Sequence, residues 1–74
     1  MDMRRLVGLN VRRLRQERGL TQEQFAEASG FSQQYISDLE RGRRNPTIVS
    51  LYELAVPLKV EPVELLKPLP EPPT

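Results

Sequence analysis

The stretch that decides the fold is residues 20–42, LTQEQFAEASGFSQQYISDLERG. It contains two short segments that each open on a hydroxyl residue. Thr21, with Gln24 three residues later, forms a capping-box pattern that starts a helix. Gly30 ends this helix after about two turns, because glycine takes up the left-handed conformation at little cost. Ser32 then caps a second short helix.

The apolar residues of this stretch recur at helical spacing. Ala26 is small enough for the second helix to cross closely over the first, and Phe31 anchors the turn in the core. Ile36 and Leu39, three residues apart, face the core from the second helix. Two short helices joined by a turn that contains glycine form a helix-turn-helix, whose second helix can enter the major groove of DNA.

Helical spacing continues on both sides of the pair. A first helix is predicted to end at Gly19, and a fourth to start at Thr47 and to end or kink at Pro57. A short fifth helix is predicted to begin at Glu61-Pro62. The residues predicted to face the core are Leu6, Val7, Leu9, Val11 and Leu14 in the first helix, and Ile48, Leu51, Tyr52, Leu54 and Ala55 in the fourth.

The predicted fold class is therefore all-α, with residues 1–67 as one domain and residues 68–74 as a disordered proline-rich tail. A chain of 74 residues buries only roughly 60% of its unfolded surface, so self-association is expected. No apolar stretch approaches the ~18 residues of a membrane span, which predicts a cytoplasmic protein without membrane contact.

Catalytic and metal chemistry find little support in the composition. The absence of cysteine and histidine excludes thiolate and imidazole chemistry and the usual zinc sites. The sequence has no phosphate-binding glycine loop and no paired carboxylates in a glycine-rich segment. We therefore expect no cofactor, no metal and no enzymatic activity.

Positive charge is concentrated in one half of the chain. Residues 1–44 hold nine arginines against six acidic residues, a balance of +3, and residues 45–74 hold two lysines against four glutamates, a balance of −2. Arginine suits phosphate recognition because its guanidinium group is planar and always charged. A solvated helix face that prefers arginine would give the same pattern, so charge alone leaves both interpretations open.

The residues at fixed spacing resemble a known family. They read Leu20-Thr21-Gln22-x-x-Phe25-Ala26-x-x-Ser29-Gly30-Phe31-Ser32, then Ile36-Ser37-x-Leu39-Glu40-Arg41-Gly42, then Pro46-Thr47. This pattern is similar to the xenobiotic-response-element family of bacterial and phage regulators, which includes lambda-type repressors, Cro proteins and the controller proteins of restriction–modification systems. The resemblance covers residues 4–66. It implies a compact five-helix lambda-repressor-like domain that binds double-stranded operator DNA as a homodimer.

Two glutamines are the leading candidates for base recognition. Gln33 and Gln34 occupy the first turn of the predicted recognition helix, residues 32–41, where side chains reach base edges. A glutamine amide can pair with N6 and N7 of adenine together. Paired glutamines are also ordinary solvent-facing helix residues, which is the alternative. Ser37, one turn further along, is expected to reach a base or a phosphate.

A second set of residues is assigned to the DNA backbone. Gln22 resembles the family's phosphate-binding glutamine at a helix N-terminus. Asp38 could accept a hydrogen bond from cytosine N4, but we expect it to pair with Arg41. For Tyr35, packing of the ring in the core is an equal alternative to a phosphate contact, and a solvated loop is the alternative for residues 43–45. The residues expected to contact phosphate or the minor groove are Gln22, Tyr35, Arg41, Arg43, Arg44 and Asn45.

Other residues are expected to support the structure. The family commonly joins the first helix to the end of the third by an ion pair, which Arg15 and Glu40 would form here. Phe25, Phe31 and Tyr52 are interpreted as core residues and not as a platform for stacking nucleobases.

Apolar residues near the C-terminus exceed what so small a core can hide. The excess residues are Val60, Val63, Leu66 and Leu69. We expect a homodimer assembled through the fifth helix and the end of the fourth, with Val60, Val63 and Leu66 in the interface and Val63 and Leu66 as the main contacts. The competing hypothesis is a protein-binding helical module of the same fold, such as an antitoxin with a toxin as its partner.

Overall fold

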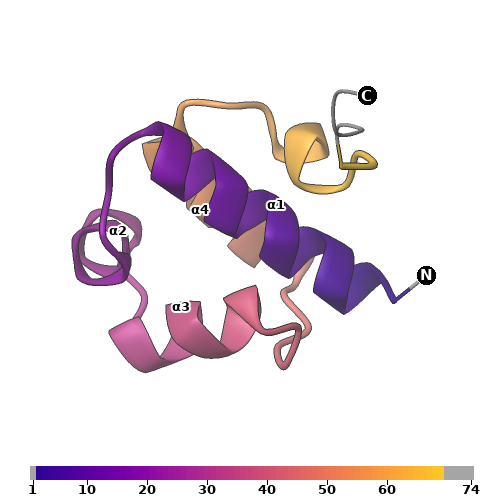
Figure 1. Cartoon of the computed structure of the whole chain (residues 1–74), viewed down its shortest axis with the longest axis horizontal. Helices are drawn as coiled ribbons and strands as arrows, with labels where there is room; N and C mark the ends of the chain where they lie inside the picture. The colour runs from indigo at the N-terminus through magenta and orange to yellow at the C-terminus, as the bar shows by residue number, and fades with distance from the viewer. Residues whose placement is uncertain (1, 70–74) are drawn as a thin grey trace, which may run out of the picture.

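The computed structural model describes residues 2–69 and contains four α-helices followed by one 3-10 turn (Figure 1). The elements are α1 (Met3–Glu17), α2 (Gln22–Ser29), α3 (Gln33–Glu40), α4 (Ile48–Leu58) and η1 (Pro62–Leu65). The all-α prediction holds for the described residues. Of the proline-rich tail predicted at residues 68–74, residues 70–74 lie outside the described part.

The predicted count of five helices is not confirmed, because the short fifth helix expected from Glu61-Pro62 is the 3-10 turn η1. Its hydrogen bonds span three residues, from the Glu64 amide to the Glu61 carbonyl at 2.9 Å and from the Leu66 amide to the Val63 carbonyl at 3.0 Å. Pro68 explains why the turn does not lengthen, since a proline disfavours the helical conformation of the residue before it.

Each α-helix begins at a side-chain cap. Asp2, Thr21, Ser32 and Thr47 all take extended backbone angles and accept a hydrogen bond from an amide in the first turn. The capping box of α2 is complete, because Gln24 in turn accepts from the Thr21 amide at 2.9 Å. Caps of this kind stabilise a helix by about 1 kcal/mol each, so the predicted starts at 21, 32 and 47 are confirmed.

The helices surround one hydrophobic core. In Figure 1, α1 crosses the centre of the molecule with α4 behind it, α2 and α3 lie to one side and η1 lies to the other. Every element contributes to the core, whose fully buried apolar side chains are Val11, Phe25, Ile36, Leu39, Leu54, Leu58 and Leu65. Burying one side chain of this size contributes about 1.5–3 kcal/mol, so the core fixes how α3 sits on α1.

The core-facing side of α4 differs from the prediction. Ile48 and Tyr52 are 86% and 60% exposed. The residues that turn inward are Leu51, Leu54, Ala55 and Leu58. Two sets of apolar residues on this helix recur at helical spacing. The set that includes Leu58 was not recognised, because the helix was expected to end or kink at Pro57. The helix instead continues through Pro57 for one residue and ends at a left-handed Lys59 (φ 57°), so Leu58 enters the core.

A buried asparagine that the sequence analysis did not single out ties the C-terminal turn to α1. Asn10 is fully buried, and its Nδ2 donates to the carbonyl oxygens of Leu65 at 3.1 Å and Lys67 at 2.8 Å. These bonds satisfy carbonyls at the end of η1 that would otherwise lack partners. The signal in the sequence is a polar residue directly before Val11, inside the apolar stripe of α1.

Candidate nucleic-acid interface

The turn between α2 and α3 sets the angle of the two helices. Gly30 has the left-handed conformation (φ 82°), and its amide donates to the Ala26 carbonyl at 3.0 Å. Ala26 is buried where the helices meet, and Phe31 lies partly buried against the core. This geometry leaves the outer side of α3 open to solvent.

The first turn of α3 presents its two glutamines. Gln33 and Gln34 are both exposed, and Ser37 is half-buried one turn further on. The Nε2 of Gln34 donates to Oδ1 of Asp38 at 3.0 Å, which leaves its carbonyl oxygen and a second amide hydrogen for other partners. The two glutamines therefore differ, since the Gln34 side chain is bonded to a neighbour four residues away and the Gln33 side chain forms no such bond within residues 2–69.

The predicted pair between Asp38 and Arg41 is wrong. Within residues 2–69, the Asp38 side chain accepts hydrogen bonds from Gln34 and, at 3.5 Å, from Nη2 of Arg44. The chain turns back after α3, with the Arg43 amide donating to the Asp38 carbonyl at 2.9 Å, and this turn places Arg44 beside the carboxylate. The loop thus partly neutralises the Asp38 carboxylate.

The ring of Tyr35 packs against its neighbours. It stacks on Phe31 with ring centroids 4.6 Å apart and an interplanar angle of 15°, and the Arg44 guanidinium lies 5.2 Å from its centroid. Burial raises the pKa of Tyr35, and the positive charge of Arg44 and a hydrogen bond with Ser50 oppose that rise only in part. The hydroxyl is therefore neutral at physiological pH, and the ring serves as a support for Arg44.

Arg15 and Glu40 form a buried ion pair that joins α1 to α3. Nε and Nη2 of Arg15 donate to the two carboxylate oxygens at 2.7 and 3.0 Å, and the side chains are only 10% and 4% exposed. Nη1 of Arg15 also donates to the Leu20 carbonyl at 2.8 Å. Gln22 adds a third element, since its Nε2 donates to Oε1 of Glu40 at 3.1 Å. One carboxylate thus connects α1, α2 and α3.

A polar pocket of about 240 Å³ opens beside this ion pair. Its lining carries three guanidinium groups against one carboxylate, a net charge of +2, and consists of Arg12, Arg15, Gln22, Ser37, Glu40 and Arg41. The pocket brings together Gln22, Ser37 and Arg41, which the sequence analysis had assigned to DNA. It also adds Arg12, whose only signal in the sequence was its place one turn before Arg15 on the same face of α1.

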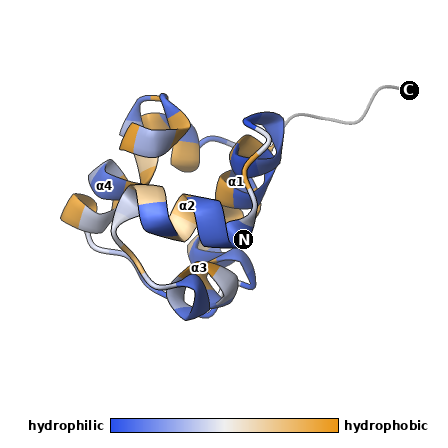
Figure 2. Ribbon diagram, turned by 90° about the vertical axis from the view of Figure 1, so that its left-hand side faces the viewer, coloured by the Kyte–Doolittle hydropathy of each residue, from blue (hydrophilic) through white to orange (hydrophobic). Residues whose placement is uncertain are grey.

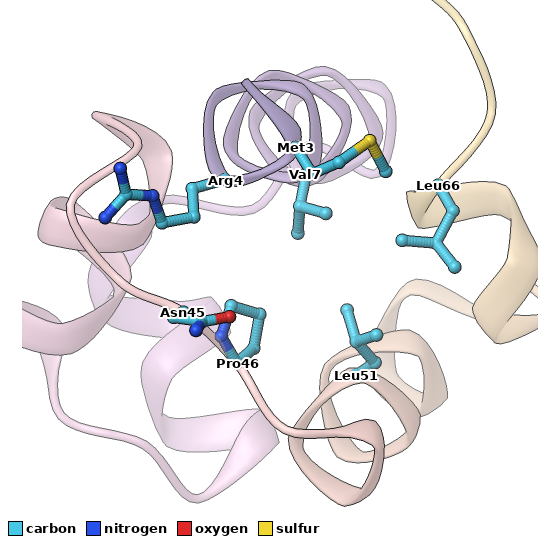
Figure 3. A pocket seen from close by; sticks show the side chains of 7 residues that line it. All are labelled: Met3, Arg4, Val7, Asn45, Pro46, Leu51 and Leu66. Carbon is cyan, nitrogen blue, oxygen red and sulfur yellow. The ribbon is translucent and has the colours of Figure 1, made fainter. Parts of the chain in front are cut away.

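The loop after α3 carries the remaining predicted contacts. Arg43, Arg44 and Asn45 are exposed, and Gly42 (φ 76°) lies against the backbone of Arg5 in α1. Behind this loop is a mostly apolar pocket of about 110 Å³, into which Leu51 and Leu66 point from α4 and from the end of η1 (Figure 3). Asn45 and Pro46 form the wall on the side of the loop after α3, so this loop and the C-terminal turn line the same cavity.

The residues predicted for the dimer interface are not equally exposed. Val63 and Leu66 are 53% and 40% exposed, whereas Val60 packs partly buried against the core and is not a free surface residue. Apolar residues along α4, and not only at its end as predicted, are exposed as well. We call this face the α4 strip, and its residues are Ile48, Val49, Tyr52 and Val56. Figure 2 shows hydrophobic stretches of α4 reaching the edge of the molecule.

No cluster of three or more acidic, histidine or cysteine side chains in residues 2–69 has the arrangement of a metal site. None of the helices in the same range is both long enough and apolar enough to cross a membrane.

Comparison with known proteins identifies relatives along nearly the whole chain. A family model described as helix-turn-helix matches residues 11–65. An uncharacterized HTH-type transcriptional regulator, y4dJ of Sinorhizobium fredii, is 64% identical over 73 residues, which cover 99% of this chain and 95% of that protein.

Solved structures share the same arrangement of helices. The restriction-modification controller protein C.AhdI from Aeromonas hydrophila superposes with a TM-score of 0.80 at 40% identity, over 84% of this chain and 90% of that one. SinR, a master regulator of biofilm formation solved in complex with DNA, superposes with a TM-score of 0.78 at 31% identity, over 82% and 98% of the two chains. These relatives are named as regulators, which is a non-enzymatic role. The chain therefore belongs to the helix-turn-helix family of transcriptional regulators of the Cro/C1 type.

Proposed function

We propose that this protein binds a specific operator in double-stranded DNA, with α3 in the major groove. The observation that carries the proposal is the position of Gln33 and Gln34. Both side chains are exposed on the first turn of α3, and positive charge lies at the other end of the same helix, in Arg41 of the polar pocket and in Arg43 and Arg44 of the following loop. A polar helix face with positive charge at one end suits a duplex whose phosphates border the groove.

In this proposal the side chains divide into two groups. Gln33, Gln34 and Ser37 read base edges, for which the amides offer donor and acceptor together. Sequence-independent contacts to phosphates or to the minor groove come from Gln22, Tyr35, Arg41, Arg43, Arg44 and Asn45. The bond from Gln34 to Asp38 restricts the rotamers of Gln34, so less conformational entropy is lost when it meets a base.

We further propose that the protein acts as a homodimer in the cytoplasm. The support is apolar surface on one small domain, namely Val63 and Leu66 near the C-terminus together with the α4 strip. A two-fold dimer would present two copies of α3 to half-sites about 34 Å apart, which is one turn of DNA. One domain alone would make few contacts.

The test is selection from random duplexes, followed by footprinting of the protein on the selected site. The proposal expects one enriched sequence with two-fold symmetry, protection of both half-sites, and affinity that falls steeply with added salt. Sedimentation of the free protein and of its complex gives the stoichiometry. Failure to enrich any sequence at low salt would overturn the proposal.

The α4 strip also supports a second candidate function, because an exposed apolar helix face suits the binding of a protein partner. A toxin-neutralising or adaptor module of this fold would bind its partner through that strip, with an affinity that changes little with salt. The salt dependence of binding therefore separates the two functions, and a neighbouring toxin gene would favour the second.

A further inference from the structure

We propose that the pocket between α1, α2 and α3 binds one phosphate of the DNA backbone, and that Arg12 of α1 holds this phosphate together with Arg41. The inference rests on the proposed function and extends it, since it brings a residue outside the helix-turn-helix into the interface. We call this cavity the phosphate pocket, and its lining is that of the 240 Å³ pocket described above.

The carboxylate at the floor of the phosphate pocket already has hydrogen-bond partners. Both carboxylate oxygens of Glu40 accept from Arg15, and Oε1 accepts from Gln22 as well. The acidic group is therefore engaged and does not compete for the other cations of the pocket. Gln22 still has a second amide hydrogen with which it can bind an anion.

The rim of the phosphate pocket carries the positive charge. Arg12 and Arg41 are exposed, and neither forms an ion pair among residues 2–69, whereas Arg13 is paired with Glu17 at 2.8 Å on the neighbouring side of α1. Two guanidinium groups at the mouth of a concave site are suited to the planar, bidentate recognition of phosphate oxygens. The net charge of +2 attracts one phosphodiester and repels cations.

The position of the phosphate pocket along α3 agrees with the docking proposed above. Gln33, Ser37 and Arg41 are spaced four residues apart and so lie along one side of the helix. Eight residues of helix span about 12 Å, which is close to the width of the major groove. If the Gln33 end of α3 meets base edges, the Arg41 end reaches the sugar–phosphate backbone that borders the groove.

The experiment compares Arg12→Gln with the matched variant Arg13→Gln, which removes the same charge from the next residue of α1. Both are measured on the selected duplex and on a random duplex at several salt concentrations. We expect Arg12→Gln to weaken binding to both duplexes by about tenfold and to lower the salt slope by about one, and Arg13→Gln to change affinity less than twofold. Arg12→Lys should recover part of the loss. Melting temperatures of the free variants check that the fold is retained, as the exposure of Arg12 leads us to expect.

A second measurement locates the phosphate. Methylphosphonate linkages, which carry no charge, are placed one at a time along each half-site. The proposal expects one position at which the uncharged linkage weakens binding of the wild type but does not further weaken binding of Arg12→Gln. If the two arginine variants lose affinity equally, or if their losses are additive at every position, the phosphate pocket does not bind DNA through Arg12.

Two further outcomes are distinguishable. If inorganic phosphate stabilises the wild type but Arg12→Gln leaves the affinity for DNA unchanged, the pocket serves free anions and the proposal is overturned. If the wild type itself binds no duplex, the proposed function fails, and the inference fails with it. If the wild type binds its operator but Arg12→Gln binds it with the same affinity, only the inference is overturned.

Discussion

Gly8 of α1 lies directly against the carbonyl oxygen of Leu39 in α3, so closely that a β-carbon on Gly8 would overlap that oxygen. The contact is made between the backbones of the two helices, and no side chain separates them. It brings the C-terminal half of α3 onto α1, next to the Arg15–Glu40 ion pair. The position of α3 therefore depends on a glycine in α1.

Gly8→Ala should destabilise the protein despite its place inside a helix. In an exposed helix the change from glycine to alanine stabilises by about 1 kcal/mol, but here the new methyl group must push α3 away, and overpacking costs about 1–3 kcal/mol. We expect a lower melting temperature and weaker binding to the operator. Gln16→Ala, at an exposed position of the same helix, is the control and should leave both unchanged. A melting temperature equal to that of the wild type would mean that α3 can move aside without cost.

Glu40→Ala should lower stability before it alters sequence preference. Removing one partner leaves Arg15 charged and largely buried, and breaking such a pair costs roughly 3–5 kcal/mol. Glu17→Ala breaks the exposed pair with Arg13 and should cost less than about 1 kcal/mol. Urea denaturation of both variants gives the comparison. Similar small losses in the free energy of unfolding would show that the buried pair stabilises the protein no more than the exposed pair does.

Asn10→Ala should loosen the C-terminal turn. The variant leaves the carbonyls of Leu65 and Lys67 without their donor, for which we expect a loss of about 1–3 kcal/mol in the free energy of unfolding. Hydrogen exchange should accelerate at the amides of residues 64–66 more than in α2. Uniform acceleration along the chain would instead indicate that Asn10 stabilises the whole fold and not the C-terminal turn in particular.

Gln34→Ala and Arg44→Ala should separate base reading from backbone binding. Loss of Gln34 should cost about 1–3 kcal/mol on the selected duplex and almost nothing on a random one, with A·T pairs losing preference most. Loss of Arg44 should weaken binding to both duplexes by similar factors and lower the salt slope by about one. Affinities at two salt concentrations decide the matter. Equal losses for Gln34→Ala on both duplexes would remove its role as a base reader.

Val63→Asp should weaken the homodimer and leave the folded monomer intact, because the side chain is half exposed and a charge there stays in water. Ala28→Asp places the same charge at an exposed position of α2, which lies on the other side of the molecule from η1 (Figure 1), and serves as the control. Sedimentation should show a higher dissociation constant for Val63→Asp alone. A dimer unaffected by this change would move the interface to the α4 strip.

The starts of three helices and the glycine turn were predictable from the sequence, because each depends on residues no more than four apart. A hydroxyl at 21, 32 or 47 accepts a bond from its own first turn, and Gly30 takes its left-handed conformation locally. The resemblance to a known pattern added the partnership of Arg15 and Glu40, which local chemistry alone does not reveal.

The tertiary structure decided what depends on the angle between elements. Ile48 and Leu58 are equally apolar, yet only Leu58 is buried, since the packing of α4 on α1 selects one of two overlapping stripes. In the same way, the closeness of Gly8 to Leu39, the partners of Asp38 and the presence of Arg12 in the phosphate pocket follow from how helices cross. Periodicity shows that a residue lies on a face, and only the core determines which face turns inward and what the outer face meets.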